Sequence, residues 1–311
     1  MPTRVLLTID TELRWDWHLS GASWQENLAL SFDPAGVGVG HQLARLAAHG
    51  LKACFFVDPM PALVYGIEPI RRMVEPILAA GQEVQLHLHP SWADTANPIF
   101  ELTGLDRERQ LELIRTARDL LVEAGAPAPI AFRSGSYAAD MATIEALAAL
   151  GIAYDSSHNG SHHPWPSALP LDPRLTAPAL LEGLVEIPVT HIEPSAGSLR
   201  HLQICAVSFA EMRSALLHAA DHRHPAVTIV GHSFELATRN GKRPNPMLVR
   251  RFETLCGFLA GQSERLPTAH FTDLDDLPLG AEARPMRSGA VRTGVRMAQQ
   301  AWGNWVHERR V

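Results

Sequence analysis

Near its start the sequence contains RVLLTIDTE, residues 4–12, a short apolar run that ends in two carboxylates. Similar short runs recur along the chain, and a longer amphipathic stretch lies between most of them. This alternation is typical of repeated βα units around a mostly parallel sheet. We therefore predict an α/β protein with about eight strands.

The predicted elements divide the chain into strands and helices. The strands are expected at 4–10, 51–57, 83–89, 129–133, 152–155, 185–190, 226–232 and 267–272, and the helices at 35–49, 67–80, 106–124, 139–150, 209–222 and 246–261. Two stretches interrupt the alternation, 14–34 and 156–182, and each follows a predicted strand. Because loops after parallel strands lie on one face of a barrel, we expect both to form the rim of a site.

Composition excludes several classes of protein. With 311 residues, 46% hydrophobic and 19% charged, the chain is predicted to fold around a core. Its 27 Lys and Arg against 33 Asp and Glu give a net charge of -6, which argues against nucleic acid as a partner. No apolar run approaches the roughly 20 residues that span a bilayer, and the first residues do not resemble a signal peptide. We predict no transmembrane segment, three free cysteines and a cytoplasmic location.

The end of the chain differs in composition from the rest. Residues 1–280 are interpreted as one barrel domain, and residues 281–311 as a basic extension rich in Arg and Gly. Apolar residues in the extension, such as Val291 and Trp302, have loosely helical spacing. The extension is predicted to be helical or partly disordered, and a helical one would suit an oligomer contact or a membrane surface.

Chemically active residue types gather where the predicted strands end. They are Asp10 and Glu12 on the first strand, His87 and His89 on the third, Arg133 on the fourth, Asp155 on the fifth, and His232 with Glu235 on the seventh. In a barrel of parallel strands the carboxyl ends converge on one mouth. The sequence therefore predicts one shared site.

The histidine pair indicates a metal site. Residues two apart on a strand point to the same side, so His87 and His89 can reach one ion, and Glu12 or Asp10 would complete a set of two imidazoles and one acid. The alternative is that the pair forms a hydrogen-bonded feature of the rim. The chain has no His-Glu-x-x-His motif and no glycine-rich phosphate loop after residue 10. Nucleotide-dependent chemistry is therefore not expected.

Five short motifs, taken together and in order, resemble those of the polysaccharide deacetylase superfamily, carbohydrate esterase family four. They are TIDTE (8–12), EVQLHLH (83–89), AFRSGSY (131–137), YDSS (154–157) and VGHSFE (230–235), and the resemblance covers about residues 4–277. It implies a distorted (β/α) barrel with seven to eight mostly parallel strands. It also implies a hydrolase that removes N-acetyl groups from an amino sugar, glycan or glycan precursor with one divalent metal ion, Zn²⁺ before others.

The resemblance assigns catalytic roles to four residues. Asp10 would be the base that takes a proton from the attacking water, and Arg133 would pair with it and keep it ionised. His232 would protonate the leaving amine, and Asp155 would orient its ring. The metal ligands implied in the same way are Glu12, His87 and His89.

Substrate contacts are expected around the mouth of the barrel. Backbone N–H groups near Ser136 and Tyr137 would stabilise the oxyanion of the reaction. Trp92, on a rim loop, would stack on a sugar ring, with loop packing as the alternative. Glu235, close to His232 in sequence, is also predicted to bind substrate.

The sequence departs from the family pattern at the metal ligands. Thr11 stands where a second acid usually follows the first, and the histidines are two apart instead of four, with Ser91 at the expected place. These departures leave open a metal-independent hydrolase of a small linear or cyclic amide. They also leave open an inactive barrel that binds a glycan or a protein, although such a module has no need of a base, its Arg partner and an acid.

Overall fold

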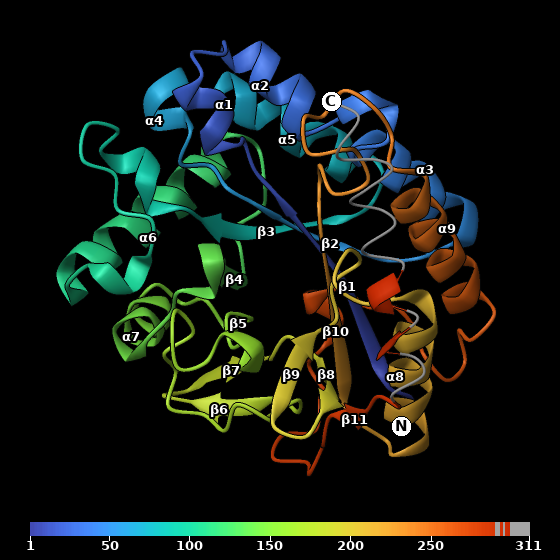
Figure 1. Cartoon of the computed structure of the whole chain (residues 1–311). Coiled ribbons are helices and arrows are strands. Elements are labelled where there is room, and N and C mark those ends of the chain that lie inside the picture. Colours follow the sequence, from blue (N-terminus) through green and yellow to red (C-terminus); the bar gives the residue numbers. More distant parts are fainter. Residues whose placement is uncertain (290–292, 295, 299–311) are drawn as a thin grey trace.

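A computed structural model describes residues 1–289, 293–294 and 296–298. Its centre is an eight-stranded sheet with the order β10-β1-β2-β3-β4-β5-β7-β6. Strand β6 is antiparallel to β7, and the other neighbours in this sheet are parallel. The sheet curls and helices cover its outside (Figure 1). This confirms the predicted distorted (β/α) barrel with seven to eight mostly parallel strands.

Seven of the eight predicted strands exist. The sheet consists of β1 (Arg4–Thr11), β2 (Cys54–Val57), β3 (Glu83–Leu88), β4 (Ala131–Ser134), β5 (Tyr154–Asp155), β6 (Ala179–Leu181), β7 (Leu184–Glu186) and β10 (Ala226–His232). The strand predicted at 267–272 is reduced to a single parallel bridge between Thr268 and Val5 of β1. Its backbone N–H groups at Phe271 and Thr272 donate to the carboxylate of Glu83, and the chain forms the short 3-10 helix η6 (Phe271–Asp273).

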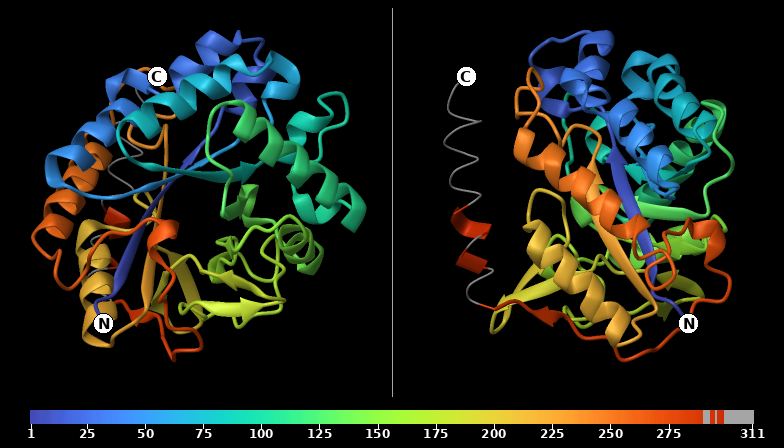
Figure 2. Two further views of the ribbon diagram at one scale, coloured as in Figure 1. Left: turned by 180° about the vertical axis from the view of Figure 1, so that it is seen from behind. Right: turned by 90° about the vertical axis from the view of Figure 1, so that its right-hand side faces the viewer.

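All six predicted helices are present. They are α3 (Val39–His49), α5 (Glu68–Ala79), α6 (Arg107–Glu123), α7 (Met141–Ala149), α8 (Phe209–Asp221) and α9 (Pro246–Ala260). Figure 2 shows from behind and from the side that these helices lie outside the strands. The rim stretch 14–34 also holds the helices α1 (Trp15–Leu19) and α2 (Trp24–Ser31), and α4 (Ala62–Tyr65) follows β2. Helix α2 begins at a capping box of Ser23 and Glu26, a sequence pattern that predicts a helix start.

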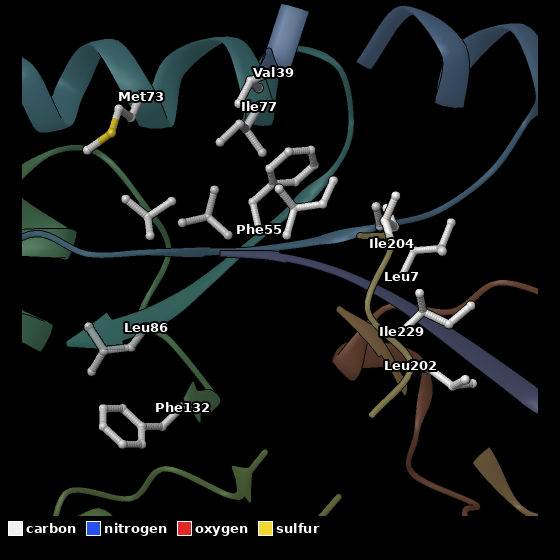
Figure 3. Close-up of a cluster of buried hydrophobic side chains, with 14 of the residues drawn as sticks. Leu7, Val39, Phe55, Met73, Ile77, Leu86, Phe132, Leu202, Ile204 and Ile229 are labelled. Atoms are coloured by element: carbon white, nitrogen blue, oxygen red, sulfur yellow. The ribbon is translucent and has the colours of Figure 1, made fainter. Parts of the chain in front are cut away.

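The two faces of the sheet differ in chemistry. On β1, Leu7 and its neighbours two residues away join the large core between the sheet and the helices, which Figure 3 shows in part with Phe55 and Leu86. The alternate residue Leu6 joins a smaller apolar cluster with Phe56 on the opposite face. Because side chains alternate along a strand, the residues that follow on that opposite face include Asp10. The inner face is therefore apolar at the amino ends of the strands and polar at their carboxyl ends.

A second, three-stranded sheet supports one side of the barrel. It is formed by β8 (His191–Ser195), β9 (Ser198–His201) and β11 (Met286–Arg287) in the order β11-β8-β9. Strand β11 belongs to the predicted extension 281–311, so the first part of that extension is packed on the body of the protein. The remainder of the prediction, at 290–292, 295 and 299–311, lies outside the described residues.

The structure bears on the predicted free cysteines and on the predicted absence of a transmembrane segment. Cys54, Cys205 and Cys256 are free, as predicted. Among the described residues, no helix has the length and apolar character needed to cross a membrane. The cytoplasmic location stays a prediction.

Candidate active site

Strand β1 places two carboxylates on the same side of the sheet. Asp10 and Glu12 are two residues apart, whereas Thr11 between them is fully buried and its hydroxyl donates to the Ile9 carbonyl at 3.1 Å. The alternation of side chains along the strand explains this arrangement. Glu12 therefore supplies an acid on the face of Asp10, which a residue at position 11 would not do.

Glu12 contacts two histidines, His87 on strand β3 and His89 directly after that strand. Its Oε2 lies 2.5 Å from His89 Nε2 and 3.4 Å from His87 Nε2. The three ligand atoms lie within 4.8 Å of one another, as a metal site requires. The structure thus brings together the three residues that were predicted as metal ligands.

Neighbouring groups fix both imidazoles. His87 Nδ1 lies 2.7 Å from the carbonyl oxygen of Arg133 and donates its proton there, because a carbonyl only accepts. In the neutral ring this leaves the lone pair of Nε2 directed towards Glu12, the arrangement common for metal-binding histidines. His89 lies against Gly135, where a Cβ atom would be 2.5 Å from its Nδ1. A larger residue at this position would displace the ring.

Charges in this cluster stabilise one another. Burial acts to raise the pKa of Glu12, but the charge of His89 and hydrogen bonds from both rings hold it well below its usual value. Burial likewise acts to lower the pKa of His89, but attraction to Glu12 outweighs burial and raises the pKa to about 9. The negative charge of Glu12 can therefore be compensated either by a proton on His89 or by a divalent ion.

Asp10 is held by a buried guanidinium. Arg133 Nη1 donates to Asp10 Oδ1 at 2.7 Å and to the Thr8 hydroxyl at 2.8 Å, and Nη2 donates to the Ser156 hydroxyl at 3.1 Å. Arg133 is 0% exposed, and its guanidinium lies over the Phe56 ring at 4.4 Å. These contacts fix the guanidinium, which in turn fixes the carboxylate.

His232 completes the group on the other side of Asp10. Its Nε2 is 4.0 Å from Asp10 Oδ2, and its Nδ1 is 3.9 Å from Glu235 Oε2 and 3.2 Å from the amide nitrogen of Gln203. Burial acts to lower the pKa of His232, but the nearby carboxylates of Glu235 and Asp10 raise it to about 9. The ring therefore favours its protonated form.

Asp155 does not lie beside His232, contrary to the prediction. It is fully buried, accepts from the Ser157 hydroxyl at 2.6 Å and stands opposite Glu186 on β7. Burial raises the pKa of both carboxyls. In the sheet order, four strands stand between β5 and β10, so being a strand end was not enough to bring Asp155 to this ring.

The carboxylate beside His232 belongs to Glu235. Its Oε2 accepts from the backbone N–H of His232 at 3.0 Å, and its Oε1 accepts from that of Cys205 at 2.7 Å. Only 8% of Glu235 is exposed. Glu235 was predicted to bind substrate. Its contacts are better suited to orienting His232.

The predicted substrate-binding residues of the rim have different surroundings. Ser136 is exposed and Tyr137 half-buried, and both have left-handed backbone conformations, with φ of 56° and 60°. Such strain in consecutive non-glycine residues is concentrated at functional sites. Trp92 is only 2% exposed and packs edge-on against Trp15 at 4.9 Å, which favours the alternative of loop packing, and the sugar contact stays a prediction.

One buried acid near the site was missed. Asp58 follows β2 directly and is 0% exposed; its Oδ1 accepts from the Met60 backbone N–H, and its Oδ2 has no hydrogen-bond partner among the described residues. Burial raises its pKa to about 6, against the attraction of His89 and His87. Its place after a predicted strand was the same pattern that identified the other site residues.

A pocket of about 400 Å³, open to solvent, lies over the Glu12 side of the site. It is lined by Glu12, Leu13, Arg14, Trp15, Asp16, His89, Ser91, Trp92, Phe100, Ser136 and Phe234. A pocket of this size with a few convergent polar groups is typical of small-molecule sites.

Solved structures share this architecture. A candidate polysaccharide deacetylase from Mycobacterium smegmatis aligns over 92% of this chain and 96% of its own, with a TM-score of 0.57 and 18% identity. The chain has the fold of the polysaccharide deacetylases. A family 4 carbohydrate esterase from Streptomyces lividans aligns over 90% of this chain and 98% of its own, with a TM-score of 0.44 and 14% identity.

The deacetylase fold is also close to that of an enzyme with different chemistry. A 4-alpha-glucanotransferase from Thermococcus litoralis aligns over 90% of this chain and 42% of its own, with a TM-score of 0.55 and 10% identity. No family model and no curated protein matches the sequence. Because these identities are low, the likeness establishes the fold, and the activity has to be argued from the site.

Proposed function

We propose that this protein is a metal-dependent amide hydrolase that removes an N-acetyl group from an amino sugar, a glycan or a glycan precursor. The observation that carries the proposal is the convergence of three groups at one mouth. They are the Glu12, His87 and His89 set, the Asp10 carboxylate held by Arg133, and the His232 ring backed by Glu235. Hydrolysis of an amide needs an activated water, a base and an acid, and these groups supply them.

The donor set fits a divalent ion. Two imidazole nitrogens and one carboxylate oxygen are the ligands of many catalytic zinc sites, which keep further positions open. His87 supports this assignment because the Arg133 carbonyl holds its Nδ1 proton and leaves Nε2 free to coordinate. When bound, Zn²⁺ or a similar ion would polarise the amide carbonyl and make a water molecule more acidic.

The remaining residues move the protons. Asp10, fixed by Arg133, takes a proton from the water that adds to the carbonyl carbon. His232 gives its Nε2 proton to the nitrogen as the carbon–nitrogen bond breaks, so acetate and a free amine leave. The exposed turn at Ser136 and Tyr137 lies at the rim of the same mouth, and we assign it the predicted role of presenting N–H groups to the oxyanion.

A second candidate is a metal-independent hydrolase of a small linear or cyclic amide. The observation that favours it is the 2.5 Å contact between His89 Nε2 and Glu12 Oε2, which a single proton can bridge without an ion. In that case His87 and His89 would hold the substrate or the rim instead of a metal.

The test measures metal content and acetate release in the same samples. Wild-type protein should retain about one ion per chain and release acetate from N-acetylglucosamine oligomers, and a chelator should abolish this until the ion is returned. The double variant His87→Ala/His89→Ala should do neither, while His49→Ala, an exposed histidine on α3, should behave as wild type. Activity on small amides without an ion would favour the second candidate, and inactivity on every amide would favour a binding barrel.

A further inference from the structure

A chain of hydrogen bonds runs from His232 to Asn159. The amide nitrogen of Gln203 lies 3.2 Å from His232 Nδ1, and its amide oxygen lies 2.7 Å from His201 Nε2. His201 Nδ1 lies 2.8 Å from the Ser161 hydroxyl, which lies 2.7 Å from Asn159 Oδ1. These contacts link His232 to Asn159 through Gln203, His201 and Ser161.

The surroundings hold this chain in place. Asn159 is 0% exposed, and His201 and Gln203 are partly buried. The rings of His162 and Tyr137 pack against His201 at 5.4 and 6.1 Å between ring centres. Burial lowers the pKa of His201 to about 4, so its ring is neutral near pH 7, with one N–H group and one acceptor.

The distances permit two directions of donation. In one, Ser161 donates to His201 Nδ1, His201 Nε2 donates to the Gln203 oxygen, and the Gln203 N–H donates to His232 Nδ1. If the amide turns over, His232 Nδ1 donates to the Gln203 oxygen, Gln203 donates to His201 Nε2, and His201 Nδ1 donates to Ser161. In that case the Ser161 hydroxyl donates to Asn159 Oδ1, and a protonated His232, which carries hydrogen on both ring nitrogens, requires this second direction.

We propose that Gln203 and His201 are positioning residues that fix the tautomer of His232, so that only its Nε2 exchanges a proton with substrate. The inference rests on the proposed function, in which His232 is the acid. When both ring nitrogens carry protons, Nδ1 donates to the Gln203 oxygen, and Nε2 gives its proton to the leaving amine. The Nδ1 proton then stays in place, and Asp10 can return the proton it took from water to Nε2.

A neutral amide suits this role because Glu235 already supplies a carboxylate near the same ring nitrogen. A second charge at position 203 would hold the proton on the ring more tightly and slow its transfer. Gln203→Glu should therefore move the basic limb of the rate profile to higher pH, and Gln203→Leu should remove the partner altogether.

The experiment combines nitrogen NMR of histidine-labelled protein with kinetics. Wild-type His232, once neutral, should show one defined tautomer, and Gln203→Leu should show an average of two. The variant should lose about tenfold in kcat on the N-acetyl amide with little change on an activated acetate ester, since general acid catalysis matters for the poorer leaving group. Gln262→Leu, whose amide donates only to Gly261 on the surface, is the matched control.

Each outcome separates this inference from the proposed function. If wild type and Gln203→Leu show the same His232 nitrogen signals and the same rates on the amide, the positioning role is overturned. The hydrolase assignment would be unaffected. A tautomer change in protein that releases no acetate would support the positioning role and count against the hydrolase. If Gln203→Leu does not fold, His201→Phe breaks the chain one bond further away, and it should shift the tautomer balance in the same direction.

Discussion

Asp10, near the end of β1, and Glu12, just after that strand, are two residues apart, yet the protein balances their charges in different ways. Asp10 accepts from a fully buried Arg133, whose positive charge is permanent. Glu12 meets two imidazoles, whose charge depends on a bound proton. The charge of Asp10 is therefore neutralised permanently by a side chain of the protein, which suits a base held in one position. The charge of Glu12 is neutralised by protons that can leave, so a metal ion can take their place.

The largest expected effect comes from Asp10→Asn, which keeps the shape of the side chain and removes the base. Acetate release should fall by about 1,000-fold, within the range that general acid–base groups contribute. Metal content should be unchanged, because Asp10 is not in the ligand set. Acetate assays and metal analysis on the same folded sample check this, and near wild-type activity would exclude Asp10 as the base.

Glu12→Gln should have a smaller effect that added metal repairs. The substitution removes the charged ligand, so we expect metal affinity to fall by at least about tenfold and activity to fall with occupancy. Excess Zn²⁺ should restore much of the loss in Glu12→Gln and none in Asp10→Asn. The comparison between the two carboxylates breaks if both variants respond to metal in the same way.

Gly135→Ala tests the position of His89 without altering any ligand. The new Cβ would lie 2.5 Å from His89 Nδ1, so the ring must move, and metal affinity should fall by about tenfold. Gly104→Ala is the control, because its Cβ would meet only Ile99 Cγ2 at 3.4 Å. Zinc titration against a competing chelator measures both. Equal zinc affinities of Gly135→Ala and wild type would mean that metal binding does not depend on the position of the His89 ring.

The smallest effect concerns the pH dependence of the acid. Because the pKa of His232 is raised to about 9, the ring is protonated below that pH, and kcat should fall as the pH rises through it. Glu235→Gln removes a negative charge that favours the protonated ring and should move this limb to lower pH. The pH dependence of kcat in both proteins measures the shift. An unmoved limb would mean that Glu235 does not act on His232.

The buried elements of the fold were predictable from the sequence. Strands β1 to β5, β7 and β10 and the six long helices have apolar patterns, because each of them buries one face or more. Strands β6, β8, β9 and β11 were missed because they are short, and β8 and β9 also carry polar residues such as His191, Glu193 and Arg200. Residues 267–272 keep one bridge to β1, at Thr268, and leave the sheet after it because a distant carboxylate, Glu83, binds the backbone of Phe271 and Thr272.

Most residues of the site could be identified because they lie at the ends of predicted strands. Which of these residues contact one another could not be predicted in the same way. Asp10, Glu12 and the histidine pair lie on adjacent or near-adjacent strands and meet as expected. Asp155 ends a strand as well, but β5 pairs with β7, and their register places Glu186 beside it instead of His232. Gln203 follows a strand that the sequence did not reveal, so no pattern could place it beside the acid.

The most direct test of the account returns zinc in known amounts to chelated protein and follows bound ion and acetate release together. Activity should rise in proportion to bound ion and stop rising at one ion per chain. His87→Ala/His89→Ala should show no such rise. Full activity in protein that holds no ion would contradict the assignment of Glu12, His87 and His89 as a catalytic metal site.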